Sequence, residues 1–96
     1  MRIGKVVGMA VATVKDARLE SAKLLLVTEA DPTGKILGKP FIAVDMVGAG
    51  EGELVIVAEG STARVAAGDA NKPVDAAIVG ILDSLRHNAK LTFKKS

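Results

Sequence analysis

The chain has 96 residues, of which 49% are hydrophobic and 25% charged, and its formal net charge is +2. This length predicts one domain, since single domains usually have about 100 to 150 residues, and the composition excludes a disordered or collagen-like protein. The absence of Cys excludes disulfides and thiolate metal sites, and no apolar run reaches the roughly 18 residues of a membrane-spanning helix. The aromatic residues are Phe41 and Phe93 alone, so we expect a small aliphatic core that oligomerisation would help to stabilise.

Alternating apolar residues in the N-terminal part predict a first strand over residues 2–14. Gly4 and Gly8 lie inside this strand, where glycine usually marks a bend or a close approach of two backbones, as at the corner of a small barrel. An aliphatic run predicts a second strand over residues 23–29. The Gly and Pro residues spread over 31–40 then predict a long loop.

The middle of the chain predicts a hairpin followed by a short helix. Strands are expected over 41–47 and 53–59, joined by a loop whose three glycines allow positive φ angles. After Gly60, a Ser or Thr is placed to cap a helix of two turns that Gly68 would end.

A buried strand is expected over residues 74–82, and the end of the chain is ambiguous. Leu91 and Phe93 alternate with polar residues as in an edge strand, whereas Ser84 would also suit the cap of a short helix; we favour an extension with some strand. The last eleven residues, 86–96, hold four Lys or Arg and no acid, so residues 1–85 carry a net charge of −2. We therefore divide the chain into a domain (1–85) and a basic extension (86–96).

Five strands with one short helix between the fourth and fifth predict an all-β fold, a small Greek-key barrel like the oligonucleotide-binding (OB) type. Many such barrels bind single-stranded nucleic acid through exposed aromatic side chains and a basic groove. This chain has two Phe residues and an acidic body. Nucleic-acid binding is therefore an alternative function and not the leading one.

The sequence lacks a recognisable catalytic motif. Residues 48–52 are rich in glycine but precede a strand, whereas a dinucleotide-binding turn precedes a helix. His87 is the only histidine and has no evident partner for a metal site or a catalytic triad. Asp45 and Asp75 lie in aliphatic strands, where an ion pair or a turn cap would satisfy them; an acid site between subunits of a small enzyme is the alternative. We expect no catalysis, no cofactor and no bound metal.

Four blocks of the sequence, at residues 3–8, 43–53, 60–64 and 73–81, closely resemble the vertex proteins of bacterial microcompartments, the EutN/CcmL family. The resemblance covers about residues 1 to 83 and implies a five-stranded barrel related to the OB fold. It also implies a homo-pentamer that caps the five-fold vertices of a protein shell in the bacterial cytoplasm, in a carboxysome or a catabolic metabolosome. Such a protein would be structural, without catalysis, and would contact the hexameric proteins of the same shell.

The resemblance further implies that two segments lie at or near the subunit contacts and the axial pore. They comprise Gly48, Ala49, Gly50, Glu51, Gly52 and Glu53, and then Gly60, Ser61, Thr62, Ala63 and Arg64. We hypothesise that Arg64 pairs with Asp45, Glu51 or Asp75 of a neighbouring subunit, because acids within strands need partners. The basic extension has no match in the family pattern, and a contact with luminal cargo or with a neighbouring shell tile is its expected role.

Overall fold

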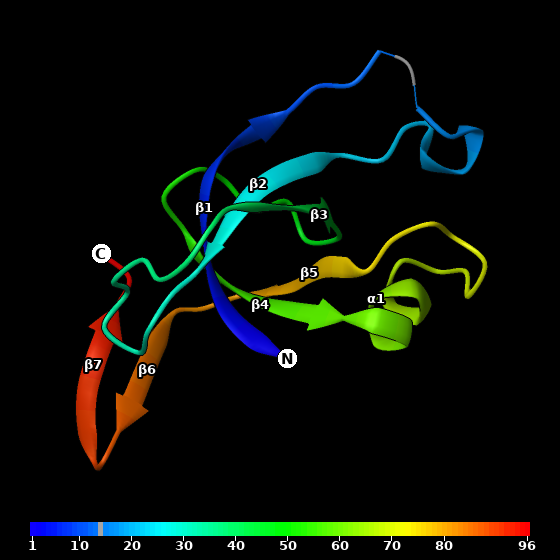
Figure 1. Cartoon of the computed structure of the whole chain (residues 1–96). Coiled ribbons are helices and arrows are strands. Elements are labelled where there is room, and N and C mark those ends of the chain that lie inside the picture. Colours follow the sequence, from blue (N-terminus) through cyan, green and yellow to red (C-terminus); the bar gives the residue numbers. More distant parts are fainter. Residues whose placement is uncertain (14) are drawn as a thin grey trace.

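A closed barrel of five strands forms the body of the protein in the computed structural model, which describes residues 1–13 and 15–96 (Figure 1). Around the barrel the strands follow the order β1, β2, β3, β5, β4, and only the β3–β5 pair is parallel. The predicted Greek-key barrel is thereby confirmed. The strands are β1 (Arg2–Ala10), β2 (Leu24–Glu29), β3 (Phe41–Asp45), β4 (Leu54–Glu59) and β5 (Ala76–Ile81).

Strand β1 bends across the barrel and pairs with both β2 and β4. A Cβ atom on Gly4 would lie 2.6 Å from Cγ1 of Val27 and 3.0 Å from Cγ2 of Val57, so the predicted close approach is confirmed there. The register between β1 and β2 shifts between Val6 and Gly8, which bends the strand. The strand ends at Ala10, earlier than predicted, and the part of that prediction that concerns residue 14 lies outside the described residues.

The barrel interior is filled by aliphatic side chains. Its largest fully buried side chains are Leu25, Ile78, Val6, Val27, Val55 and Val57, whereas Leu54, equally buried, packs outside the barrel beside Gly34 and Phe93. A second cluster lies outside the barrel and contains Val44, Ala67 and Val74. No aromatic residue is fully buried among the described residues, and Phe41 packs against the edge of the core. The predicted small aliphatic core is confirmed.

Helix α1 (Gly60–Ala66) lies between β4 and β5, as predicted, and covers one end of the barrel through Ala63, which is completely buried. The predicted Ser or Thr cap is wrong. Glu59 is the N-cap, without a side-chain hydrogen bond, and Ser61 and Thr62 lie within the first turn. Gly60 has a φ of +61°, which glycine adopts without strain where the chain turns from β4 into the helix. Gly68 follows the helix with a φ of +95° and ends it as predicted.

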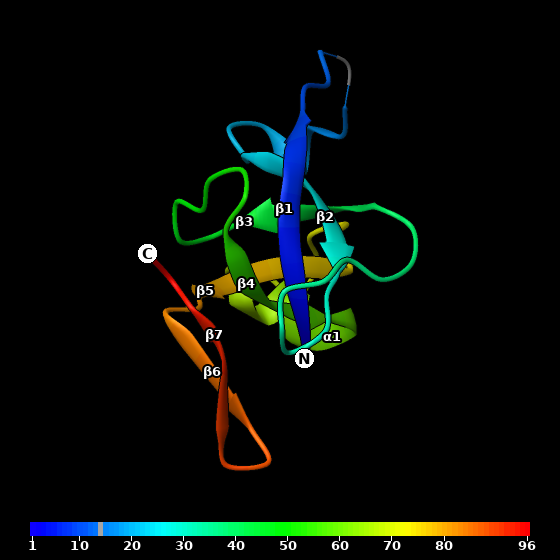
Figure 2. The same cartoon turned by 90° about the vertical axis from the view of Figure 1, so that its left-hand side faces the viewer.

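The C-terminal residues form a two-stranded antiparallel hairpin, β6 (Ser84–His87) and β7 (Lys90–Lys94). It projects from the barrel at the end opposite α1 (Figures 1 and 2), so the molecule measures 44 × 23 × 22 Å. The strand expected around Leu91 is confirmed, and the alternative helix capped by Ser84 is wrong. Asn88 and Ala89 have φ angles of 53° and 62°, the geometry of a tight hairpin turn.

A short 3-10 helix, η1 (Ala17–Leu19), lies in the connection between β1 and β2. Among the described residues, neither α1 nor η1 has the length and apolar character that crossing a bilayer requires.

Candidate assembly surface

Asp45 ends β3 and anchors the loop that follows it. Its side chain is 1% exposed, and Lys23 Nζ lies 3.7 Å from its Oδ2. Its Oδ1 accepts hydrogen bonds from the backbone N–H groups of Val47, Gly48 and Ala49, at 3.1, 3.2 and 3.2 Å. Asp45 is therefore a turn cap whose charge is compensated within its own chain.

The loop of residues 48–53 is held in one conformation by burial of Ala49 and by a hydrogen bond to β1. Ala49 is buried in the barrel core, and Gly48 and Gly52 have φ angles of 78° and 90°. The Gly52 N–H donates to the carbonyl of Val6 at 2.7 Å, which ties the loop to β1. Gly48 and the tip, residues 50–52, are exposed on either side of the buried Ala49, so the loop presents a short ordered ridge.

Glu53 connects this loop to the C-terminal hairpin. Its Oε1 accepts from the Gly50 N–H at 2.7 Å, and its Oε2 lies 2.6 Å from Lys95 Nζ. The hydrogen bond from Lys95, and then that from Gly50, lower the pKa of the Glu53 carboxyl; the same ion pair raises the pKa of Lys95. The sequence did not indicate this link, because the two residues are 42 positions apart.

The second segment, residues 60–64, lies at the opposite end of β4. The Gly60 N–H donates to the carbonyl of Asp75 at 2.9 Å, which places Asp75 beside the start of α1. Arg64 is partly exposed and Asp75 exposed, and neither side chain forms an ion pair among the described residues. Within one chain, therefore, Arg64 lies far from the ridge, and its guanidinium is available to a second molecule.

Next to Asp75, an ion-pair cluster links three strands. Arg2 Nε lies 2.6 Å from Glu59 Oε1, and Arg2 Nη1 lies 3.3 Å from Glu29 Oε1. Arg2, Glu59 and Asp75 line a pocket of about 250 Å³ together with Phe41. This cluster was not predictable from the sequence, because its partners meet only through the register of β1 with β2 and β4.

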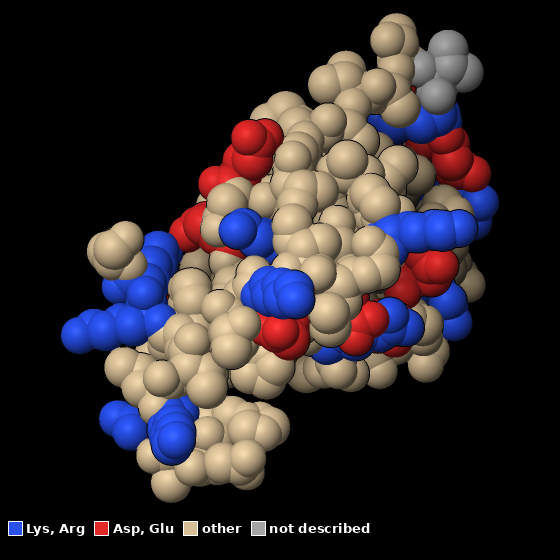
Figure 3. Space-filling view, turned by 60° about the vertical axis from the view of Figure 1, so that its left-hand side comes forward, with Lys and Arg blue, Asp and Glu red and all other residues tan. Residues whose placement is uncertain are grey.

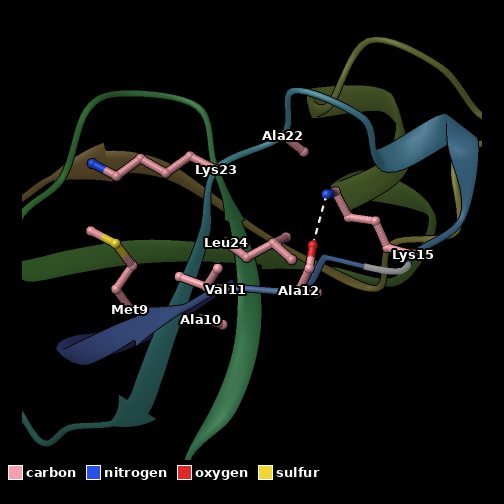
Figure 4. Close-up of a pocket in the computed structure, with 8 residues that line it drawn as sticks. All are labelled: Met9, Ala10, Val11, Ala12, Lys15, Ala22, Lys23 and Leu24. Carbon is pink, nitrogen blue, oxygen red and sulfur yellow. Dashed lines mark hydrogen bonds between the residues drawn. The ribbon is translucent and has the colours of Figure 1, made fainter.

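Apolar side chains are exposed at several places around these segments. Val65 on α1 is 68% exposed, Met9 65% and Val11 88%, and Met46 and Val47 lie exposed just before the ridge. Figure 4 shows Val11 and Leu24 in a shallow pocket between Met9 and Lys15, whose Nζ donates to the carbonyl of Ala12 at 2.9 Å. Single exposed apolar residues are common on any protein, so the contiguous group around Met9, Val11 and Leu24 is the better candidate for a contact surface.

The carboxyl groups whose pKa values are shifted do not suit the role of a general acid. Hydrogen bonds from Arg18 lower the pKa of Asp16 to about 2, and hydrogen bonds led by that from Thr33 lower the pKa of Asp31. With Glu53, these carboxyl groups are stabilised as anions, which is the opposite of what a general acid needs. Among the described residues, no group of three or more His, Cys, Asp or Glu side chains could hold a metal ion.

Comparison with known proteins agrees with this interpretation. Residues 1–83 match the family model described as ethanolamine utilisation protein EutN/carboxysome. The chain belongs to the EutN/CcmL family. It is 43% identical over 96 residues to the carboxysome shell vertex protein CcmL of Nostoc sp., covering 99% of this chain and 95% of that protein. It is also 38% identical over 95 residues to the microcompartment shell vertex protein EutN of Escherichia coli, covering 99% and 100%.

Solved structures of this EutN/CcmL family superpose closely. The Nostoc CcmL structure has a TM-score of 0.91 with 43% identity and covers 99% of this chain and 100% of that one. The GrpN pentameric microcompartment shell protein of Rhodospirillum rubrum has a TM-score of 0.82 with 41% identity, covering 91% and 100%. The family resemblance found in the four sequence blocks is thus confirmed, as is the extent of about residues 1 to 83.

Proposed function

We propose that this chain is a shell vertex protein, a homo-pentamer that caps the five-fold corners of a bacterial microcompartment in the bacterial cytoplasm. The observation that carries this proposal is its similarity to proteins named as shell vertex proteins, which extends over nearly the whole of both chains. Relatives of both the carboxysome and the ethanolamine type match, so the shell is that of a carboxysome or a catabolic metabolosome. The role is structural and non-enzymatic.

The barrel suits this role because its two ends differ. A contact between different surfaces of identical subunits, repeated by rotation, closes into a ring when the rotation divides a full turn. A ring of five introduces the curvature that flat layers of hexameric proteins lack. We infer that hexameric proteins of the same shell surround the pentamer.

The inferred subunit contacts and pore surroundings are the two segments of residues 48–53 and 60–64. Both segments have a fixed conformation, which supports this assignment. Asp45 and Glu53 hold the ridge, and the buried Ala63 holds α1 against the barrel. Arg64 is inferred to reach an acid of the neighbouring subunit. Glu51 and Asp75 suit this pairing better than Asp45, whose carboxylate is already bonded to three N–H groups.

Two alternative functions have less support. A nucleic-acid-binding barrel would expose aromatic side chains for stacking, whereas Phe41 and Phe93 are both half-buried. A small enzyme with an acid site between subunits would use Asp45 or Asp75, but the buried carboxylate of Asp45 is occupied as a turn cap.

The decisive measurement is the native mass of the purified protein across a dilution series. A mass five times the 9.9 kDa of the chain is expected. A persistent monomer that binds a labelled single-stranded oligonucleotide would favour the nucleic-acid barrel and contradict the vertex function. Binding of the oligonucleotide should be measured in the same dilution series, so that both functions are tested on one sample.

We also infer that the basic extension contacts luminal cargo or a neighbouring shell tile. Deletion of residues 86–96 should then leave shells that close poorly or lose cargo in cells, with the full chain as the control. Closed shells with normal cargo would contradict this contact.

A further inference from the structure

The base of the hairpin β6–β7, where Ser84 and residues 93–95 meet the barrel, is held in place and is called its foot below. Lys95 Nζ is paired with Glu53, and the Lys95 N–H donates to the carbonyl of Asp83 at 2.8 Å. Phe93 is half-buried and lines a small pocket at the foot together with Leu54. These contacts hold the hairpin at a defined angle to the barrel without help from a second molecule.

The outer half of the hairpin, residues 86–91, is cationic, and its cations have no ion-pair partner among the described residues. Arg86 and Lys90 are exposed, as is Lys94 at the foot opposite Ser84, and none of the three forms an ion pair among the described residues. Residues 84–96 contain no acid. Figure 3 shows blue side chains on the hairpin and red ones only over the barrel on this face. Between the cations lies Leu91, which is 49% exposed and pairs with Arg86 across the two strands.

This outer half is unfavourable as an isolated structure. A two-stranded ribbon is at best marginally stable in water, and His87 lies directly opposite Lys90, so the pairs at the tip add no ionic attraction across the strands. An anionic partner would relieve the repulsion among the cations, and an apolar side chain of that partner would cover Leu91. The chemistry of the hairpin therefore fits a segment with both carboxylates and aliphatic residues.

Other occupants fit less well. The buried centre of a stable subunit interface is depleted in Lys, which argues against burial of this cationic tip under the next protomer. Single-stranded nucleic acid is bound on exposed aromatic rings, whereas the one aromatic side chain of the hairpin, Phe93, packs at its foot. An acidic protein segment uses the features that are present.

We propose that the outer half of the hairpin is a docking site for one kind of partner, a protein segment that is acidic and partly aliphatic. This inference rests on the proposed function, since it assigns a chemistry to the partner of the basic extension. Five copies around a vertex would present five such sites, and weak individual contacts would add through multivalency.

The test uses the full-length protein and a short labelled peptide in which Glu and Leu alternate. The hairpin variant is Arg86→Gln/Lys90→Gln, and the matched control is Lys35→Gln/Lys39→Gln, which removes two exposed cations elsewhere. We expect the hairpin variant to bind the peptide about three- to thirty-fold more weakly at low salt, and the control to bind like the wild type. Binding should also weaken as salt rises from about 0.01 to 0.15 M, because the Debye length falls from about 30 to 8 Å.

Equal binding by the two variants, or equal binding of a peptide with Gln in place of Glu, would overturn the proposal. A labelled single-stranded DNA that binds more tightly through the same residues would assign the hairpin to nucleic acid instead. Loss of the oligomer in the hairpin variant would assign it to the next protomer. A monomeric wild type that still binds the peptide through the hairpin would contradict the vertex function and leave the docking site standing.

Discussion

Lys95 and Glu53 form an ion pair with 2.6 Å between Nζ and Oε2, and this pair joins the C-terminal hairpin to the ridge before β4. Glu53 also accepts from the Gly50 N–H, so one carboxylate fixes both the shape of the ridge and the foot of the hairpin. The two surfaces proposed for assembly and for docking are therefore coupled through a single side chain.

The first prediction concerns the foot of the hairpin. Lys95→Met should speed hydrogen exchange of the β6–β7 amides, because the hairpin loses its link to the barrel. The neighbouring variant Lys94→Met removes an exposed cation that has no ion pair among the described residues, so it should leave exchange unchanged. Equal exchange rates in both variants would contradict an anchoring role for Lys95.

The same pair predicts a pH dependence. The folded pKa of Glu53 is lowered from 4.5, so its contribution is complete above about that pH and is lost as the pH falls through the folded pKa. The folded pKa of Lys95 is raised from 10.5, so its contribution is complete below that pH and is lost on further increase. Hairpin protection should therefore be flat between these limits and fall at acid pH in the wild type but not in Glu53→Gln.

The second prediction concerns the close approach at Gly4. Gly4→Ala should lower the free energy of unfolding by about 1 to 3 kcal/mol, because the added Cβ would lie 2.6 Å from Val27 Cγ1. Gly8→Ala is the matched control in the same strand, where the nearest atoms lie at 3.6 Å, an ordinary contact. Urea unfolding of both variants measures the difference, and equal stabilities would show that the barrel accommodates the methyl group.

The sequence predicted the elements better than the contacts between them. The period of two in β1 and the aliphatic runs in β2 and β5 are local signals, so five strands and the barrel followed from them. The partners of Arg2 were not predictable, because Glu29 and Glu59 reach it only through the register of three strands. The hairpin turn was missed although Asn88 is a residue type that tolerates positive φ.

The candidate site was predictable only in part, because its contacts join segments that are distant in the sequence or depend on loop conformation. Asp45 stood out in an aliphatic strand, and the turn cap was among the expected explanations, but its three N–H donors belong to a loop whose conformation the sequence does not specify. The Ser or Thr cap of α1 was wrong because the N-cap is Glu59 and the helix begins at Gly60, which places Ser61 and Thr62 inside its first turn. The interface role of residues 48–53 and 60–64 stays a prediction.

The third prediction separates the stability of the subunit from that of the ring. Asp45→Ala should cost about 1 to 3 kcal/mol in urea unfolding, because it removes the acceptor of three N–H groups. Asp45→Asn keeps an oxygen that can accept and should cost less. If Asp45→Ala unfolded like the wild type but dissociated more readily on dilution, Asp45 would be the partner of Arg64 across the interface.

The last prediction concerns Arg64 itself. Its guanidinium is partly exposed and, among the described residues, forms no ion pair within the chain, so Arg64→Ala should barely change the folding of an isolated subunit. If Arg64 pairs with an acid of the neighbouring subunit, as we propose, the same change leaves that acid without its partner at five interfaces at once. The variant should therefore dissociate at higher protein concentration and melt at a lower temperature than the wild type, whereas Lys35→Ala, which removes an exposed cation from a loop, should do neither.

Combining Arg64→Ala with Glu51→Ala or Asp75→Ala identifies the partner. The true partner shows a non-additive effect on the dissociation constant, because the second change removes an acid whose cation is already gone. The other acid shows an additive effect. A pentamer of unchanged native mass and thermal stability in Arg64→Ala would rule out the ion pair, yet the vertex function would stand, because it rests on the ring and not on this one contact.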